Sequence, residues 1–146
     1  MNRPDKDTYY LDIAKAVSQR STCLKRRYGC VIVKDDVIVS TGYNGSPRGY
    51  YNCCDTGKCQ RKDSARYQGY ENCPAVHAEQ NALLQVDRAH SQGATLYLVC
   101  EDIIMGIEDL DPLPCGICQN MIRNAGINRV VTRAREVHVD GTYRRY

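Results

Sequence analysis

The chain has 146 residues, of which 42% are hydrophobic and 25% charged, and its net charge is +3. This composition indicates one soluble, globular domain that spans residues 1–146. The mild charge does not favour a nucleic-acid-binding protein, because such proteins carry a strong basic cluster. The apolar runs are only strand-sized and the N-terminus lacks the pattern of a signal peptide, so we expect a cytoplasmic protein without a membrane segment.

The nine cysteines are a high count for a chain of this length. In a secreted protein they would indicate disulfides. Here the number is odd and no signal peptide is recognised, so we expect metal ligation instead.

The first half of the chain predicts a helix, a hairpin and a long irregular segment. Apolar residues at helical spacing predict a helix over residues 5–19. Two β-rich runs, 28–34 and 37–42, predict a hairpin, and the turn-forming residues 42–49 follow as a loop. Residues from about 50 to 75 show no periodicity and contain four cysteines. A loop of this length is usually functional or pinned, and a metal would pin it.

The second half alternates helices with strands. We expect helices over 76–88 and 115–125, strands over 94–100 and 127–132, and an acidic loop over 101–113. The order of elements predicts an α/β fold in three layers, α/β/α, with a central mixed sheet of about five strands.

Three candidate metal ligands lie at the starts of two of these helices. His77 begins one, and Cys115 and Cys118 begin the other after Pro114, which fits a first helical turn. Cysteines three residues apart lie on one helix face, and the partial positive charge of a helix N-terminus favours thiolate. Two such N-termini can converge on one ion and leave its fourth position open, which is the pattern of catalytic zinc.

Glu79 supplies what such a site would lack. Two thiolates cancel the charge of Zn²⁺ and weaken it as a Lewis acid, so a water molecule there needs help to lose its proton. Glu79 is close to His77 in sequence, and a carboxylate at the open position can take that proton and pass it to a leaving amine. Hydrolytic deamination requires these two transfers.

Each motif alone has a simpler interpretation. A single C-x-x-C is often a redox pair or half of a structural zinc ribbon, and H-x-E at a helix start is often a capping arrangement. A non-catalytic zinc-binding module would explain the cysteines but neither Glu79 nor an open coordination position. The two motifs together favour a zinc hydrolase that acts on an amine.

Three segments resemble the deoxycytidylate (dCMP) deaminase family: GYNGSPRG at 42–49, VHAEQNAL at 76–83 and PCGIC at 114–118. The likeness runs from about residue 12 to residue 131. The zinc motif alone marks the wider cytidine deaminase superfamily. The pairing of GYNG with HAEQNA is more specific and favours a free nucleotide as substrate. The resemblance therefore implies a cytidine-deaminase-like fold.

The resemblance implies hydrolysis of dCMP to dUMP and ammonia, which would feed thymidylate synthesis. It implies zinc on His77, Cys115 and Cys118, with Glu79 as general acid and base. Asn44 matches an asparagine that contacts the sugar hydroxyl in such enzymes. Its simpler interpretation is a turn former. Ala78 matches a residue whose backbone lines the base pocket.

A nucleotide substrate needs cations for its phosphate. Lys25, Arg26, Arg27 and Arg48 flank the predicted cleft, and a solvated basic face is the simpler interpretation of any one of them. Arginine offers bidentate geometry, and we choose Arg27 and Arg48. A tyrosine could also stack on cytosine, for which the tail offers Tyr143.

The family is typically hexameric and is regulated by nucleoside triphosphates with Mg²⁺, dCTP activating and dTTP inhibiting. The resemblance implies a homo-hexamer with the same effectors. Tyr43 and Gly45 lie in the loop that would join the active and regulatory sites. Arg88 matches a position associated with subunit contact and regulation.

Several members of the family carry a second, structural zinc. Cys23, Cys53 and Cys73 occupy the corresponding places, with cysteine where relatives use histidine. Cys59 is the best fourth ligand, and Cys54 could replace one member. A closed site of four thiolates would explain how the irregular loop stays ordered.

Two features depart from the family pattern. The acidic segment 101–113 is longer than the usual turn before Pro-Cys, and the chain after the last strand is short. Related functions also stay open. A tRNA adenosine deaminase, a competence-operon type deaminase or another nucleotide deaminase would share the zinc motif. The first of these should show a more basic surface.

Overall fold

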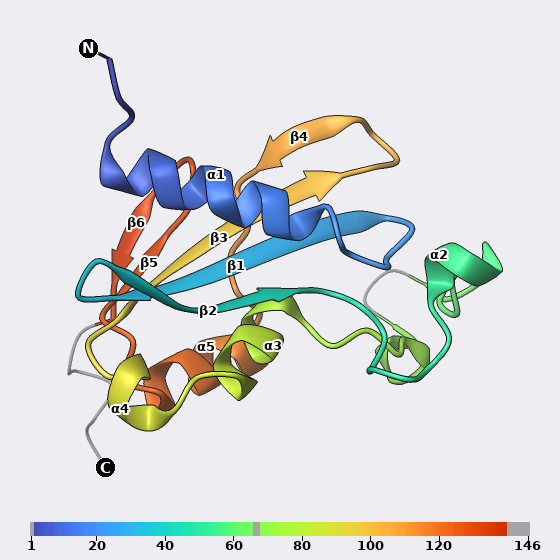
Figure 1. Ribbon diagram of the computed structural model, residues 1–146. Helices are drawn as coiled ribbons and strands as arrows, with labels where there is room; N and C mark the ends of the chain where they lie inside the picture. The colour runs from blue at the N-terminus through green and yellow to red at the C-terminus, as the bar shows by residue number, and fades with distance from the viewer. Residues whose placement is uncertain (1, 66–67, 140–146) are drawn as a thin grey trace.

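The computed structural model describes residues 2–65 and 68–139, and its centre is a mixed sheet (Figure 1). The strand order is β2-β1-β3-β5-β6, and β4 pairs with β3 off this path. The pair β3–β5 is parallel and the other pairs are antiparallel. The strands are β1 (Arg26–Lys34), β2 (Val37–Tyr43), β3 (Thr95–Asp102), β4 (Ile107–Leu110), β5 (Arg129–Val131) and β6 (Glu136–His138).

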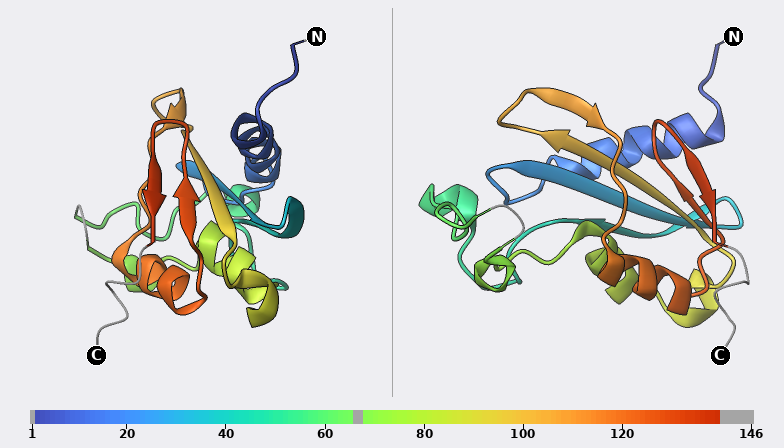
Figure 2. Two further views of the ribbon diagram at one scale, coloured as in Figure 1. Left: turned by 90° about the vertical axis from the view of Figure 1, so that its left-hand side faces the viewer. Right: turned by 180° about the vertical axis from the view of Figure 1, so that it is seen from behind.

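Helices cover both faces of the sheet, which confirms the predicted three-layer α/β/α fold. Helix α1 (Lys6–Ser18) lies on one face, whereas α3 (Ala78–Leu84), α4 (Arg88–Ser91) and α5 (Gly116–Asn124) lie on the other (Figures 1 and 2). Two cores result. Side chains of β1 alternate between them, so that Cys30 and Ile32 pack with α3 and α5 while Val31 and Val33 pack with α1.

Glycines let both helical layers approach the sheet closely. A Cβ on Gly29 would lie 1.9 Å from the carbonyl oxygen of Ala14 in α1. A Cβ on Gly42 would lie 2.4 Å from the carbonyl oxygen of Ala78 at the start of α3. Neither position accepts a side chain without moving a helix, and the contact at Gly42 fixes the height of α3 above β2.

The structure corrects the predicted helix over 76–88. Helix α3 ends at Leu84, and the short α4 begins after Asp87, whose side chain accepts a hydrogen bond from the backbone N–H of His90 at 2.8 Å. The apolar spacing continues through this break, so periodicity alone did not reveal it. An aspartate at an N-cap is the signal that marks a new helix start.

The acidic segment is also corrected, because residues 107–110 form β4 instead of a loop. Its carboxylates pair with cations of neighbouring elements: Glu108 with Lys15 of α1, and Asp111 with Arg135. These ion pairs hold the hairpin of β3 and β4 against α1 and the β5–β6 connection. The short β6, which the sequence did not predict, pairs with β5.

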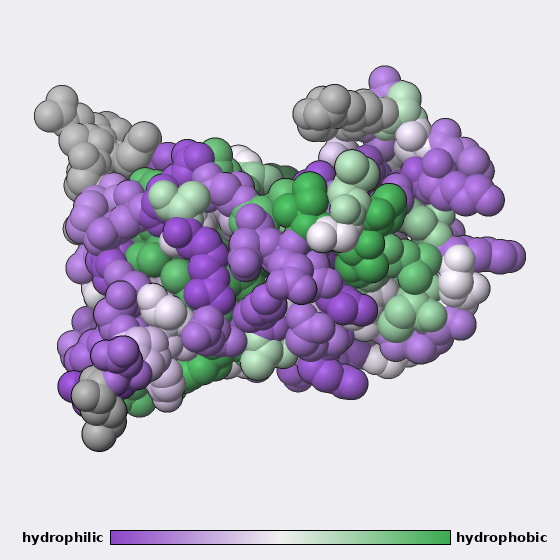
Figure 3. Space-filling model, turned by 90° about the horizontal axis from the view of Figure 1, so that it is seen from above, coloured by the Kyte–Doolittle hydropathy of each residue, from purple (hydrophilic) through white to green (hydrophobic). Residues whose placement is uncertain are grey.

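The turn of the β3–β4 hairpin carries exposed apolar side chains. Ile104 and Met105 are both largely exposed, and Figure 3 shows apolar atoms beside hydrophilic ones on the upper face where this hairpin lies. The backbone N–H of Ile103 donates to the carbonyl oxygen of Lys25 at 2.9 Å, which ties the turn to the start of β1.

The cysteine-rich segment lies beyond the sheet, at the side where β1 begins (Figure 1). It contains the short helix α2 (Cys53–Thr56) and a 3₁₀ turn over Tyr70–Asn72, and is otherwise irregular. The backbone N–H of Cys54 donates to the carbonyl oxygen of Thr22 at 3.1 Å. In the described part of the chain, no helix has the length and apolar character needed to cross a membrane.

Candidate metal centre

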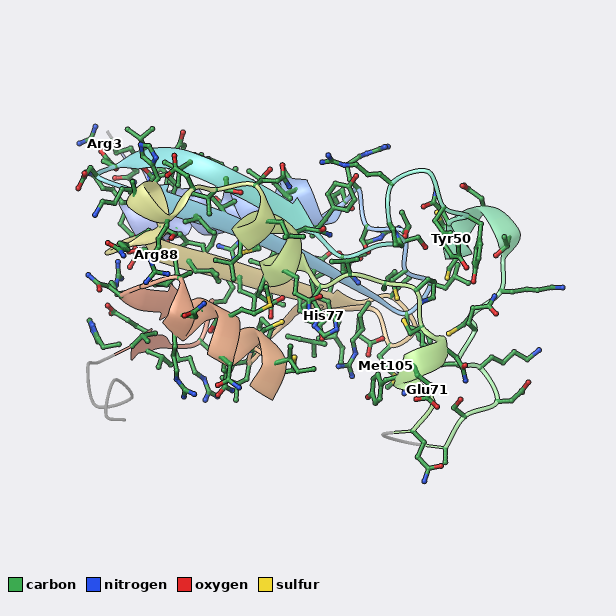
Figure 4. All side chains as sticks on the ribbon, turned by 90° about the horizontal axis from the view of Figure 1, so that it is seen from below. Arg3, Tyr50, Glu71, His77, Arg88 and Met105 are labelled. Atoms are coloured by element: carbon green, nitrogen blue, oxygen red, sulfur yellow. The ribbon has the colours of Figure 1, made fainter. Side chains whose placement is uncertain are left out.

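The candidate ligands come together where α3 and α5 begin. His77 directly precedes α3, Cys115 directly precedes α5, and Cys118 lies in the first turn of α5. The Nδ1 atom of His77 lies 3.6 Å from Sγ of Cys115 and 3.3 Å from Sγ of Cys118. Figure 4 places His77 between these two helices. The three ligand atoms lie within 4.8 Å of one another, and they are the only such set of three or more that the described residues contain.

This geometry fits zinc. Zinc bonds to sulfur at about 2.3 Å and to imidazole nitrogen at about 2.0–2.1 Å, so tetrahedral ligation places N and S roughly 3.6 Å apart. The distance to Cys115, 3.6 Å, agrees with that value, and the distance to Cys118, 3.3 Å, is slightly shorter. His77 and Cys115 are exposed and Cys118 is buried, so the open side of the group faces solvent. One imidazole and two thiols with a solvent-facing side are suited to catalytic zinc.

Hydrogen bonds from neighbouring residues fix the two helix starts. The side-chain oxygen of Gln80 accepts from the backbone N–H of His77 at 2.8 Å. On α5, the side-chain amide of Gln119 donates to the carbonyl oxygen of Pro114 at 2.8 Å. The first bond is made by the ligand His77 itself, and the second by Pro114, the residue before the ligand Cys115. Local hydrogen bonds therefore help to position the ligands.

Glu79 lies in the first turn of α3 and is buried, with 4% of its surface exposed. Burial raises the pKa of the Cys118 thiol well above its usual range, and the charge of Glu79 adds to this increase. A divalent cation reverses both effects, because it stabilises the thiolate and attracts the carboxylate. Glu79 therefore lies beside the ligand group, where its carboxylate can accept and release a proton.

One face of β1 and β3 forms a wall beside Glu79, made of Arg26, Tyr28 and Cys30 on β1 and of Cys100 and Asp102 on β3. Burial raises the pKa of the Cys30 thiol, and the Glu79 charge is the next cause. Cys100 on β3 pairs in register with Tyr28 on β1, and burial raises the pKa of Cys100 to about 11. The charges of Arg26, Asp102 and Glu79 also affect the pKa of that thiol. Sequence reasoning missed this wall, although the alternation of β1 places residues 26, 28 and 30 on one face.

Asn44 fastens the end of β2 to the start of β1. Its side-chain oxygen accepts from the backbone N–H of Tyr28 at 2.8 Å, and its side-chain nitrogen donates to the carbonyl oxygen of Arg26 at 3.0 Å. One N–H and one lone pair of the amide are left for a further partner. Asn44 is buried, so such a partner would have to reach the amide from the side of Tyr28 and Arg26.

The loop over residues 42–49 is joined to the residues before and after His77. Gly45 and Val76 exchange two backbone hydrogen bonds, at 3.1 and 2.7 Å. The side-chain nitrogen of Asn81 donates to the carbonyl oxygen of Tyr43 at 2.8 Å. Ala78, the first residue of α3, is fully buried. These contacts bring the GYNG and HAE segments together.

Arg88 is placed differently. Its guanidinium donates to the carbonyl oxygen of Asn124 at the end of α5, at 2.7 Å. It therefore lies well away from His77, near the other end of the helical layer (Figure 4).

The basic residues chosen for phosphate divide between the two faces of the sheet. Strand alternation places Arg27 on the face of the sheet that α1 covers. Its guanidinium donates to the side-chain oxygen of Gln19 at 3.3 Å and lies 3.5 Å from a carboxylate oxygen of Glu101. The structure does not bring Arg27 to the metal side. Arg26 is on that side, beside Tyr28 and Asp102. Arg48 is exposed in the loop after Asn44. Tyr143 lies outside the described residues.

The cysteines chosen for a second metal lie near one another without reaching ligand distance. Burial raises the pKa of the Cys53 thiol, and the thiols of Cys59, Cys73, Cys23 and Cys54 contribute in that order. These thiols therefore lie close enough to Cys53 to interact with it electrostatically. Within the described ranges, no three of these sulfur atoms lie as close as the ligands at His77 do.

A three-layer fold with one imidazole, two thiols and an adjacent glutamate at two helix starts defines the class of zinc-dependent deaminases. The family model of the cytidine and deoxycytidylate deaminase zinc-binding region matches residues 4–134. The chain therefore belongs to that family.

Individual relatives agree with this assignment. The chain is similar to a deoxycytidylate deaminase of Mycobacterium phage D29, with 43% identity over 138 residues, 90% of this chain and 96% of that protein. It is 40% identical to a deoxycytidylate deaminase of Schizosaccharomyces pombe over 88% of this chain but only 37% of that protein. A dCMP deaminase from the cyanophage S-TIM5, solved in complex with dCMP and dUMP, has a TM-score of 0.63 and 28% identity, covering 89% of this chain and 82% of that one.

Proposed function

We propose that this protein hydrolyses dCMP to dUMP and ammonia. The observation that carries the proposal is the group of His77, Cys115 and Cys118 with the buried Glu79 beside it. The similarity to a phage deoxycytidylate deaminase over nearly the full length of both chains supports dCMP as the substrate.

The proposed chemistry assigns a proton-transfer role to Glu79. When bound by His77, Cys115 and Cys118, zinc supplies a Lewis acid at the solvent-facing side of the group. The Glu79 carboxylate accepts a proton from the water that attacks C4 of cytosine and delivers it to the amino nitrogen that leaves as ammonia. Its burial beside the ligands keeps it within reach of both positions.

The rest of the nucleotide is proposed to lie along the wall. Asn44 has one N–H and one lone pair left, and a sugar hydroxyl both donates and accepts. The backbone of Ala78 would line the base pocket. For the phosphate we propose Arg26 and Arg48 ahead of Arg27, because Arg26 shares the face of Glu79 while Arg27 is paired on the other face.

A second zinc is proposed at Cys23, Cys53, Cys59 and Cys73. Mutual proximity of these thiols supports it, since several of them act on the Cys53 thiol. Closing the segment on an ion would order a stretch that has little regular structure of its own.

The family resemblance extends the proposal to regulation and assembly. We propose a cytoplasmic homo-hexamer that supplies dUMP for thymidylate synthesis, activated by dCTP and inhibited by dTTP with Mg²⁺. Tyr43, Gly45 and Arg88 are the proposed effector or interface residues. If dCTP and dTTP both leave the saturation curve for dCMP unchanged, this regulation is wrong.

One assay tests the main proposal. The purified protein is incubated with dCMP, CMP, deoxycytidine, dCTP or a tRNA, and ammonia release is followed. We expect release from dCMP that disappears in Glu79→Ala while zinc content stays the same. Full activity in that variant would overturn the proposed mechanism, and turnover of the tRNA alone would replace the proposed substrate.

A further inference from the structure

The β3–β4 hairpin places a carboxylate beside the proposed phosphate cation. Arg26 on β1 and Asp102 on β3 are paired in register, and Nε of Arg26 lies 3.6 Å from Oδ2 of Asp102. The Arg26 side chain is 53% exposed but that of Asp102 only 14%, so the carboxylate is shielded from solvent while the guanidinium faces it.

This pair lies in line with the catalytic group. Along β1, residues 30, 28 and 26 point to the same face at intervals of about 6.6 Å, and Cys30 packs in the core with Ala78 and Ala82 of α3, the helix that carries Glu79. On the neighbouring strand, Cys100 and Asp102 lie opposite Tyr28 and Arg26 in register, so they follow along the same face of the sheet. A nucleotide with its base at Glu79 therefore extends its phosphate toward Arg26 and Asp102.

We propose that Asp102 is a specificity-determining residue that limits the substrate to one phosphate. This inference rests on the proposed function of the same site. Arg26 attracts the first phosphate, while Asp102 repels every negative charge that arrives there. The repulsion grows with each added phosphate, and it is weakly screened because the carboxylate is shielded. Attraction by Arg26 and repulsion by Asp102 together favour a substrate with one phosphate.

The charge of Asp102 can be removed without losing the hydrogen bond that holds the hairpin turn. Oδ1 of Asp102 accepts from the backbone N–H of Met105 at 2.9 Å, which holds the hairpin turn. Asparagine keeps that acceptor and removes the charge. Glu101 provides a matched control one residue away, because it lies on the opposite face and pairs with Arg27.

The test compares substrates of increasing charge, namely deoxycytidine, dCMP and dCDP, without Mg²⁺ or triphosphates. For Asp102→Asn we expect kcat/KM to be unchanged for deoxycytidine, to rise about threefold for dCMP and to rise about tenfold for dCDP. Asp102→Glu, which keeps the charge, and Glu101→Gln should both keep the wild-type ratio of dCDP to dCMP. An unchanged ratio in Asp102→Asn, or an equal change for all three substrates, overturns the proposal.

Binding separates this inference from the proposed reaction. Affinities for deoxyuridine, dUMP and dUDP, measured by calorimetry, should change in the same order in Asp102→Asn. If dCMP is not turned over but this binding series holds, the proposed function fails while the charge limit stands. If the affinity ratio of dUDP to dUMP is the same in Asp102→Asn and the wild type, or neither binds, the charge limit is wrong.

Discussion

The two groups of cysteines in this protein differ in what positions them. Cys115 and Cys118 are set by the start of α5 and meet His77 at the start of α3, so their ligand atoms already lie within 4.8 Å of one another. Cys23 and Cys59 lie in irregular chain, and Cys53 begins a helix of only four residues. Among the described residues, no three of their sulfur atoms lie within 4.8 Å of one another.

On the proposed assignment of two zinc ions, this contrast predicts which part of the molecule depends on its metal for local folding. A ligand group fixed by helices and by hydrogen bonds to Gln80 and Gln119 costs little further ordering when an ion binds. A group carried on irregular chain must be ordered by the ion itself, so binding and local folding become one event. The first group is therefore suited to chemistry and the second to structure.

The largest expected effect separates proton transfer from metal holding. In Glu79→Gln we expect kcat for dCMP to fall by about 10²–10⁴-fold, because the amide cannot carry the proton, while zinc content is unchanged. Ammonia release and metal analysis measure the two quantities. Glu71→Gln is the control, since Glu71 is an exposed glutamate of the cysteine-rich segment. Comparable activity in the two variants would contradict the role of Glu79.

Removing a ligand of the first group should abolish function without unfolding the protein. In Cys115→Ser we expect at least about a hundredfold loss of activity and the loss of one zinc per chain. The midpoint of thermal unfolding should change by only a few degrees, because the two helix starts are held by their own hydrogen bonds. Unfolding at room temperature would show that the ion, rather than the helices, orders this region.

Removing a ligand of the second group should have the opposite pattern. In Cys53→Ser we expect loss of the other zinc and cleavage between residues 50 and 75 by a protease about tenfold faster, because the segment loses its cross-link. Activity should fall only severalfold. Cys54→Ser is the matched control, since Cys54 is the exposed neighbour. Equal protection in both variants, with one zinc in the wild type, would remove the second site.

The last prediction concerns how steeply the zinc affinities of the two proposed sites depend on pH. In the metal-free protein, burial raises the pKa of both Cys53 and Cys118, so both thiols hold protons at neutral pH and zinc must displace them. Affinity therefore falls as pH falls, by up to about tenfold per pH unit for each thiol proton. With four thiols against two, the logarithm of the zinc affinity of the second site should fall about twice as steeply between pH 8 and 6. Competition with a coloured chelator measures both affinities, and equal slopes would contradict the four-thiol assignment.

Sequence patterns were sufficient for the layers and for the ligand group. Periodicity identified α1, the β1–β2 hairpin and α5, because each has one clear apolar face. The residues His77, Cys115 and Cys118 could be grouped before the structure was known, because a metal imposes residue types and spacings that are visible in one dimension.

Other elements needed the third dimension. Residues 101–113 are acidic as a sequence, yet part of them forms β4 because it pairs with β3, and Lys15 and Arg135 from distant elements balance its charge. The break between α3 and α4 was hidden by continuous apolar spacing. The assignment of Arg27 to the phosphate ignored strand alternation, which places it on the α1 face with Gln19 and Glu101.

The sequence by itself determined the family and predicted the metal ligands and the proton carrier, since these depend on residue identity at short spacing. Only the tertiary structure decided which side chains surround that group. Tyr28, Cys100, Arg26 and Asp102 come from strands about 70 residues apart and meet through the register of β1 with β3. Strand register is set by the packing of both faces of a sheet, and no local pattern encodes it.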